Sequence, residues 1–358
     1  MSAMSAPDHS ADTVPAPARP VSPGRRIWQR FRASRHGYWS LVIFAVLFAI
    51  SLCAELISND KPLVARYQGH LIFPMWQDYP DRSFGGDFDS PADYLDPFIQ
   101  DQFNKDGNWA LYPLNRYRYD TLNYFAQAPN PAAPSAENWL GTDDRGRDVF
   151  ARLFYGFRVS ILFGLALTAI GVVLGIAAGA LQGYFAGRTD LFMQRILEIW
   201  GSMPELYLLI IFASIFQPSL GLLLVLLSAF GWMGLADYVR ADFLRNRNLD
   251  YVQAARALGL PDRLIIWRHI LPNSLTTVVT FLPFRMSASI LALTSLDFLG
   301  LGVPPPTPSL GELLAQGKDN LDAWWIALST FVVLTVTLLL LTSIGSALRN
   351  ALDVRRKA

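Results

Sequence analysis

Six apolar stretches, each close to 20 residues or longer, constrain this chain more than any other feature of its sequence. A helix needs roughly 20 apolar residues to cross a bilayer, and only helices and closed barrels satisfy every backbone polar group inside one. The sequence therefore predicts an all-α integral membrane protein with about six transmembrane helices. The expected spans cover residues 38–57, 159–181, 191–216, 220–239, 274–299 and 324–347.

Composition favours the same class. Only 16% of the residues are charged, against about a quarter in soluble domains, and 52% are hydrophobic. The 30 Lys and Arg residues nearly balance the 29 Asp and Glu residues, which argues against a protein that binds nucleic acid through a basic excess. The single cysteine, Cys53, excludes an intrachain disulfide and a cysteine-based zinc site.

Lys and Arg residues gather before the first span, between the fourth and fifth, and after the sixth, so these segments belong inside the cell. Both termini are therefore expected in the cytoplasm. The expected organisation follows the chain in order. It has a cytoplasmic basic segment over residues 1–37, a first transmembrane helix over 38–58, an extracytoplasmic insertion over 59–138, a core over 139–347 with an inner loop over 241–272, and a cytoplasmic tail over 348–358.

The insertion over residues 59–138 is rich in acids and aromatic rings. It holds eleven acids, six bases and fifteen aromatic residues, which is too long and too aromatic for a flexible linker. We expect a small ordered unit. Two interpretations stay open: a lid that packs on the transmembrane bundle, and a docking surface for an external partner.

Four glycines repeat every fourth residue in the second span, at Gly171, Gly175, Gly179 and Gly183. Residues four apart share one face of a helix, so these glycines form a groove that another backbone can approach closely. Bare glycines offer no ligand to a solute. The pattern therefore predicts a helix-packing face.

Three ionisable residues inside the predicted spans are candidates for a transport pathway: Glu198, Arg285 and Asp297. Asp297 lies near the outer end of its span, where simple solvation is the alternative. Pro204 lies within the third span, which must therefore be kinked or face other protein. Glu198 with Pro204 and Arg285 with Pro283 also give some support to an ion-coupled secondary transporter, which uses broken helices. That alternative expects an internal repeat, and we find none.

The basic inner loop between the fourth and fifth spans contains a two-helix pattern. A short helix is expected over residues 251–258, then Gly259 in the left-handed conformation, then a second helix that starts at Pro261 and is stopped by Pro272. Ala254, Ala255 and Gly259 would form an exposed corner of small residues, while Leu258, Leu260 and Ile265 would fill a partner's pocket. The alternative is a helical hairpin lying in the lipid interface.

Acids precede the second span, and Thr142 is expected to cap an outer helix whose first turn holds Asp143 and Asp144. A metal site formed with Asp148 is the less favoured alternative, because three such acids without histidine usually form a solvated helix start. The four histidines are scattered, and residues 311–319 lack the spacing of a phosphate-binding loop. We expect no metal site, no catalytic residues and no enzyme activity.

Part of the inner loop resembles the coupling loop of bacterial ABC importer permeases. The family pattern reads Glu-Ala-Ala, three residues, Gly, then a Leu-Pro pair, and it is matched by Ala254, Ala255, Gly259, Leu271 and Pro272. Three further stretches are similar to the dipeptide and oligopeptide branch: RHILPN from 268, WLGTDDRGRDVFARLFYG from 139 and SLDFLGLGVPPPTPSLGELL from 295. The aromatic insertion looks most like the permease of microcin C type peptide importers.

This resemblance implies a type I ABC permease in the bacterial inner membrane that transports peptides or peptide-like compounds. It implies a second homologous permease, two cytoplasmic ATPase subunits that bind the ATP, and an extracytoplasmic solute-binding protein; the chain itself would hold no cofactor. Gln253 stands where the family has Glu, which removes a charge from the docking corner. The residues expected to contact the ATPase are Tyr251, Gln253, Ala254, Ala255, Leu258, Gly259, Leu260, Leu271 and Pro272.

Overall fold

The computed structural model describes residues 23–105, 107–122, 124 and 129–353. Within them, five helices are long and apolar enough to cross a membrane, or six if one bent pair counts as a single span. The predicted helical membrane fold is confirmed. The expectations for residues 1–22 and 354–358 lie outside the described residues. The five spans are Arg35–Leu52, Val149–Phe185, Leu220–Asn246, Asp262–Phe298 and Trp324–Leu352.

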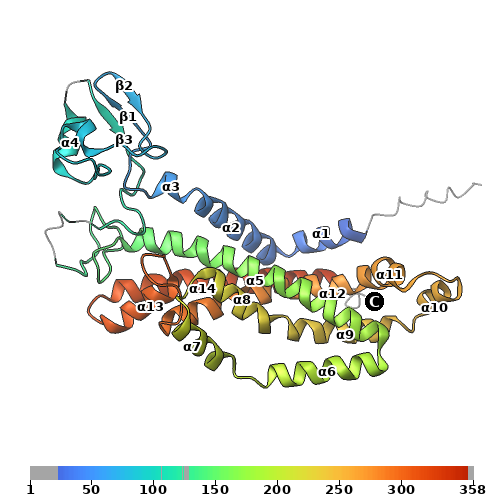
Figure 1. Cartoon of the computed structure of the whole chain (residues 1–358). Helices are drawn as coiled ribbons and strands as arrows, with labels where there is room; N and C mark the ends of the chain where they lie inside the picture. Colours follow the sequence, from blue (N-terminus) through green and yellow to red (C-terminus); the bar gives the residue numbers. More distant parts are fainter. Residues whose placement is uncertain (1–22, 106, 123, 125–128, 354–358) are drawn as a thin grey trace, which may run out of the picture.

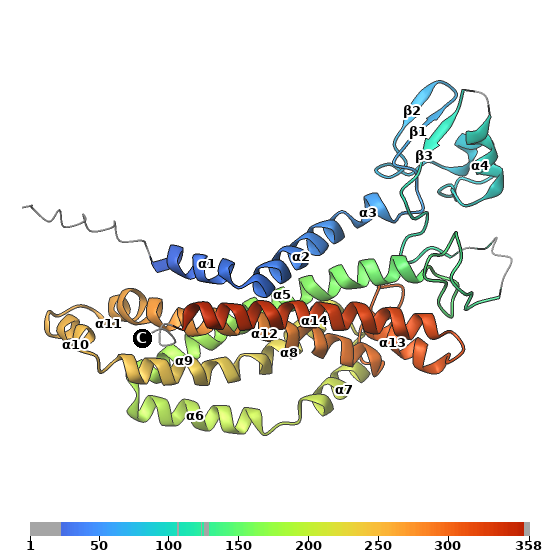
Figure 2. The same ribbon diagram turned by 180° about the vertical axis from the view of Figure 1, so that it is seen from behind.

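The first and last spans pack together. Helix α1 (Pro23–Ala33) precedes α2 (Arg35–Leu52) and the short α3 (Ala54–Ile57), and α14 (Trp324–Leu352) lies beside α2. Phe31 of α1 is buried against the end of α14. The basic N-terminal helix and the end of the last span therefore share one end of the molecule, as both ribbon views show (Figures 1 and 2).

Helix α5 (Val149–Phe185) is the longest element and runs through the centre of the bundle (Figure 1). Its 37 residues give a length of about 55 Å, well above the thickness of the hydrocarbon core. The Asp148 side chain caps its first turn by accepting a hydrogen bond from the Ala151 amide at 2.7 Å. One helix thus connects the two ends of the bundle.

The glycine face of α5 lies against α9 (Met233–Asn246). A Cβ atom on Gly179 would lie 2.5 Å from the Ala236 carbonyl oxygen, and one on Gly183 would lie 2.4 Å from the Phe243 Cβ. A Cβ on Gly175 would be 2.9 Å from Leu235. These distances are shorter than any side chain tolerates, so α9 approaches α5 closely because the glycines leave room for it.

The third predicted span is broken into α6 (Gly187–Gly201) and α7 (Glu205–Ile215), which meet at 63°. Pro204 precedes α7, where its ring prevents the first helix from continuing. The fourth span is likewise two helices, α8 (Leu220–Gly231) and α9, with Trp232 between them. Figure 2 shows α6 and α7 at the edge of the bundle.

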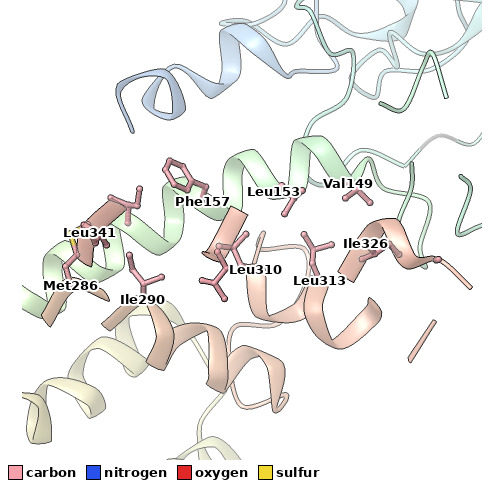
Figure 3. Packing of buried hydrophobic residues seen from close by; sticks show 12 residues of the cluster. Val149, Leu153, Phe157, Met286, Ile290, Leu310, Leu313, Ile326 and Leu341 are labelled. Atoms are coloured by element: carbon pink, nitrogen blue, oxygen red, sulfur yellow. The ribbon is translucent and has the colours of Figure 1, made fainter. Parts of the chain in front are cut away.

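The outer half of the bundle is packed around α5, α12 (Leu271–Phe298), α13 (Leu310–Asp319) and α14. Figure 3 shows Leu153 of α5 pointing toward Leu310 and Leu313 of α13, and Phe157 and Ile290 belong to the same buried cluster. Lipid tails are as apolar as these side chains, so the cluster stabilises the bundle through close packing rather than through exclusion of water. It fixes α13 against α5.

The insertion is a separate small unit that adds the only strands of the described residues. Strands β1 (Val64–Tyr67), β2 (His70–Ile72) and β3 (Trp109–Leu111) form an antiparallel sheet in the order β2-β1-β3, next to η1 (Asp81–Phe84) and α4 (Pro97–Asn104). Its own core is formed by Ala65, Phe84, Ala92, Tyr94, Ile99 and Phe103.

In both ribbon views this unit stands beyond the outer ends of α2 and α5 and does not cover the bundle (Figures 1 and 2). It is joined to α5 at its base, where Asn115 Nδ2 donates to Asp148 Oδ1 at 2.8 Å and where Leu95 and Tyr117 are buried with Ala151 of α5. The sheet and α4 pack on each other, while the base of the unit packs on α5, so the lid interpretation stays a prediction. The docking interpretation stays a prediction.

Candidate functional site

The inner loop forms an elbow, residues 247–270, at the end of the bundle that also holds α1 and the end of α14 (Figures 1 and 2). It leaves α9, forms α10 (Asp250–Ala257), turns, and continues through α11 (Asp262–Leu264) and a π-helical segment (Ile265–Ile270) into α12. The elbow therefore connects two transmembrane helices directly.

The turn after α10 is a Schellman motif. Gly259 has a φ of +74°, as predicted; its amide donates to the Arg256 carbonyl at 2.9 Å, and the Leu260 amide donates to the Ala255 carbonyl at 3.2 Å. Apart from its two chain neighbours, no residue that the structure describes lies within 4 Å of a Cβ placed on Gly259. The corner is therefore rigid in its backbone and open to the surroundings.

Several of the predicted contact residues are exposed at this corner. Leu258 is 81% exposed and forms its tip, and Tyr251 is 40% exposed. Gln253 and Ala254 are also exposed, and Leu260 is half-buried beside them. An apolar side chain this open on a basic inner surface is suited to insertion into a pocket of another protein.

Other predicted contact residues are wrong in role, because they face inward. Ala255 is 4% exposed, Ile265 is fully buried and Leu271 is 6% exposed, and all three belong to one cluster with residues of α5 and α9. They anchor the elbow to the bundle and cannot enter a partner's pocket. The cause is helical periodicity: Val252 and Ala255 lie three residues apart on the inner face of α10.

The expected stop at Pro272 is also wrong. Pro272 occupies the first turn of α12, where a helix needs no amide hydrogen from that residue, so the second arm of the elbow runs on into the fifth span. Residues Asp262–Phe298 are one 37-residue helical run. A displacement of the elbow is therefore transmitted directly along the fifth span.

Gln253, which replaces the family's Glu, folds back on the elbow. Its Nε2 donates to the Asn248 carbonyl at 3.1 Å. The Tyr251 hydroxyl accepts a hydrogen bond from Asn273 Nδ2 at 2.9 Å, which links the first arm of the elbow to the start of α12. Both side chains stabilise the shape of the corner and remain exposed beside Leu258.

The three candidate pathway residues are held at separate places. Arg285 donates through Nη2 to the Gly231 carbonyl at the end of α8, and its Nε has no acceptor among the described residues. Glu198 forms an ion pair with Arg195, one helical turn away on an exposed face of α6. Arg285 and Glu198 therefore bond to different partners and do not pair with each other.

Asp297 bonds to the loop that follows α12, and its role in a pathway stays a prediction. Its carboxylate accepts hydrogen bonds from the Val303 amide at 3.1 Å and from the Ser309 hydroxyl, and Ser309 in turn caps α13. A Cβ atom on Gly302 would overlap Asp297 Oδ1. Asp297 therefore fixes the loop between α12 and α13.

Sequence reasoning missed a buried ion network at the outer end. Asp143 is fully buried and pairs with Arg147 at 2.7 Å and with Arg152 Nε at 3.4 Å, and both arginines reach Glu312 of α13, Arg147 at 3.2 Å. The segment before α5 is thus a loop held by charges, and the helix predicted after Thr142 is absent from it. No local pattern pairs residues about 160 positions apart.

The metal alternative for this segment is not supported, since no group of acids, histidines or cysteines among the described residues could hold an ion. Asp148 instead receives hydrogen bonds from Asn115 and Asn138. Burial raises the pKa of the Asp148 carboxyl above its ordinary value, while these hydrogen bonds oppose the shift.

Comparison with known proteins agrees with these features. Residues 171–358 match the family model described as "Binding-protein-dependent transport system inner membrane component", and residues 22–78 match "N-terminal TM domain of oligopeptide transport permease C". The inner membrane ABC transporter permease protein YejE of Escherichia coli is 51% identical over 93% of this chain and 97% of its own length.

Two more relatives and one solved structure extend the comparison. The peptidoglycan transport system permease protein YejE of Agrobacterium fabrum is 48% identical over 96% of this chain and 97% of its own. The oligopeptide transport system permease protein OppC of Haemophilus influenzae is 38% identical over 62% of this chain and 72% of its own. An inward-facing MetNI methionine ABC transporter aligns with 56% of this chain and 96% of that chain at a TM-score of 0.47 and 18% identity, a likeness too remote to bear on function.

These matches confirm the resemblance read from the coupling-loop pattern and decide against an ion-coupled secondary transporter. With its apolar spans, the chain is a multi-pass protein of the inner membrane. It belongs to the family of binding-protein-dependent transport system inner membrane components.

Proposed function

We propose that this chain is the transmembrane subunit of an ATP-driven importer that carries peptides or peptide-like compounds across the inner membrane. The observation that carries the proposal is the elbow: an exposed leucine on a rigid corner that continues directly into the fifth span. The names of its relatives, which include peptide, oligopeptide and peptidoglycan transport permeases, support this substrate class.

The proposed assembly contains a second homologous permease, two cytoplasmic ATPase subunits and an extracytoplasmic solute-binding protein. ATP is bound by the ATPase subunits, and this chain needs no cofactor of its own. The elbow shares one end of the molecule with the basic helix α1 and the end of α14, and the basic charge at this end supports a cytoplasmic position for it and for both termini. The insertion then lies on the extracytoplasmic side of the inner membrane, where a solute-binding protein docks.

In this scheme the elbow acts as a lever. Closure of the ATPase subunits around ATP displaces the corner at Leu258, and packed helices transmit the displacement with little compliance. The covalent path leads into α9 on one side and into α12 on the other. Tilting of these two helices opens the pathway outward, and hydrolysis resets it.

The test replaces Leu258 with Asp and measures how much ATPase subunit co-purifies with the permease. A charge at the tip of the corner is expected to remove the ATPase subunits and ATP-dependent peptide uptake together. Leu321→Asp is a matched control, because Leu321 is 80% exposed on the loop between α13 and α14. Retention of stoichiometric ATPase by Leu258→Asp would overturn the proposal.

A further inference from the structure

The inner end of α5 touches the elbow, although the chain does not connect them. Tyr184 lies one residue before the end of α5 and is only 2% exposed. Its neighbours come from three successive segments: the residue after α9, helix α10 and helix α11. No other residue described in the structure is seen to bond to all three.

Each of these contacts uses a different part of Tyr184. The backbone carbonyl accepts a hydrogen bond from Arg247 Nη1 at 2.9 Å. The ring lies under the Arg256 guanidinium, whose carbon is 4.8 Å from the ring centroid. The hydroxyl donates a hydrogen bond to Asp262 Oδ1 at the start of α11. The residue therefore holds the elbow before, within and after its corner.

Apolar packing surrounds these polar contacts. Tyr184 belongs to the same buried cluster as Val252 and Ala255 of α10 and Ile265 of the π-helical segment. The neighbouring Gly183 lets Phe243 of α9 approach the α5 backbone. Because the elbow packs on Tyr184 and bonds to it, the elbow cannot move relative to α5 without breaking at least one of these polar contacts.

We infer that Tyr184 is a positioning residue that clamps the elbow to α5, so that movement of the elbow is delivered to the central helix as well as to α9 and α12. The inference rests on the proposed function and adds a route that the chain connectivity does not supply. It matters because the outer end of α5 carries Arg152, which pairs with Glu312 of α13. Force applied at the inner corner thereby reaches the outer layer along one continuous helix.

The experiment uses the complete transporter, reconstituted in vesicles with its solute-binding protein, and measures peptide uptake and ATP hydrolysis in the same sample. Tyr184→Phe removes the hydroxyl bond to Asp262 and keeps the ring under Arg256. We expect the ATPase subunits to stay bound and hydrolysis to continue, while peptide taken up per ATP falls about fivefold or more, the range of ordinary coupling between sites.

Four variants separate clamping from mere stability. Tyr155→Phe removes a comparable hydroxyl bond at the outer end of α5, where Tyr155 donates to the Ser58 carbonyl at 2.9 Å, and should leave uptake per ATP unchanged. Asp262→Asn keeps an oxygen acceptor for the Tyr184 hydroxyl and should stay close to wild type, whereas Asp262→Ala should resemble Tyr184→Phe. The double variant of Tyr184→Phe with Asp262→Ala should be no worse than either single change.

A distance measurement supplies a second readout. Spin labels on cysteines at Phe185 and Trp267, in a chain whose Cys53 is replaced by Ser, report the separation of α5 from the elbow; Trp267 is 67% exposed and is not one of the proposed ATPase contacts. In the otherwise unaltered chain this distance should stay constant when ATP binds, and with Tyr184→Phe it should change. If Tyr184→Phe fails to fold, the Asp262→Ala variant tests the clamp instead, because Asp262 is exposed.

The outcomes are distinguishable. Wild-type uptake per ATP in both Tyr184→Phe and Asp262→Ala would overturn the clamp and leave the proposed function intact. Loss of the ATPase subunits from Tyr184→Phe would also overturn it, because the residue would then act in docking rather than in transmission. Failure of the proposed function itself would appear separately, as retention of ATPase by Leu258→Asp.

Discussion

Removal of the Glu312 carboxylate should destabilise the outer end of the bundle strongly. Glu312 is the second acid of the network that neutralises Arg147 and Arg152, and the Arg152 side chain is fully buried. In Glu312→Ala, Asp143 is the one remaining acid in contact with both guanidinium groups among the described residues. One buried positive charge is then left without compensation.

The expected size follows from the burial of the network. Breaking a buried ion pair by removing one partner costs 3–5 kcal/mol, and Glu312 is 17% exposed, so the lower value of about 3 kcal/mol applies. At about 2 °C per kcal/mol for a large domain, the melting temperature should fall by about 6 °C. The melting temperature of Glu312→Gln should fall by less, because the glutamine keeps an oxygen acceptor for the arginines.

The assay is thermal unfolding of the purified permease in detergent, followed by size-exclusion chromatography of the heated samples. Asp319→Asn is a matched control on the same helix, because Asp319 pairs with Lys318 at 3.3 Å with both side chains well exposed, and such pairs contribute little. Melting of Glu312→Ala within about 1 °C of the control would refute the assignment of a compensated buried network.

Three further results are expected. Gly183→Val should abolish recovery of monodisperse protein, because its side chain would overlap Phe243. Gly221→Val should be recovered normally, because a Cβ at Gly221 has no described residue within 4 Å apart from its chain neighbours. Gly259→Val forces a φ of +74° on a β-branched residue, at a strain of about 1–2 kcal/mol. ATP-dependent uptake should therefore fall while membrane insertion stays unchanged. Normal uptake would contradict the coupling role of the corner. Burial raises the pKa of the Asp148 carboxyl, so the buried carboxylate disfavours folding at pH values above that pKa and no longer does so below the ordinary pKa of 3.8. The melting temperature of the wild type should therefore rise relative to that of Asp148→Asn as the pH falls from 7.5 toward 4. A constant difference between the two melting temperatures would contradict the raised pKa.

Local pattern was enough to predict the parts of this fold that depend on local chemistry. Apolar length indicated the spans, Pro204 indicated the break in the third, and Gly259 indicated the left-handed corner. Each of these depends on a few neighbouring residues and on the surrounding lipid. The spacing of Gly171 to Gly183 likewise indicated a packing face, and α9 lies along most of it.

The features that were missed depend on contacts between distant segments. Ala255 looked like part of an exposed corner, yet its burial depends on how α10 rests on α5 and α9. Asp143 and Glu312 are far apart in sequence, so only the folded chain shows them sharing two arginines. Pro272 looked like a helix stop because a proline can follow the end of one helix or occupy the first turn of the next, and in the structure it occupies the first turn of α12.

The most direct test of the elbow as the inner attachment point is labelling of a Leu258→Cys variant, with Cys53 replaced by Ser, by a maleimide that cannot cross membranes. We expect labelling in inside-out vesicles stripped of ATPase subunits, protection when those subunits are added back, and no labelling of intact right-side-out vesicles. Labelling from the outside, or equal labelling with and without the ATPase subunits, would contradict the coupling function.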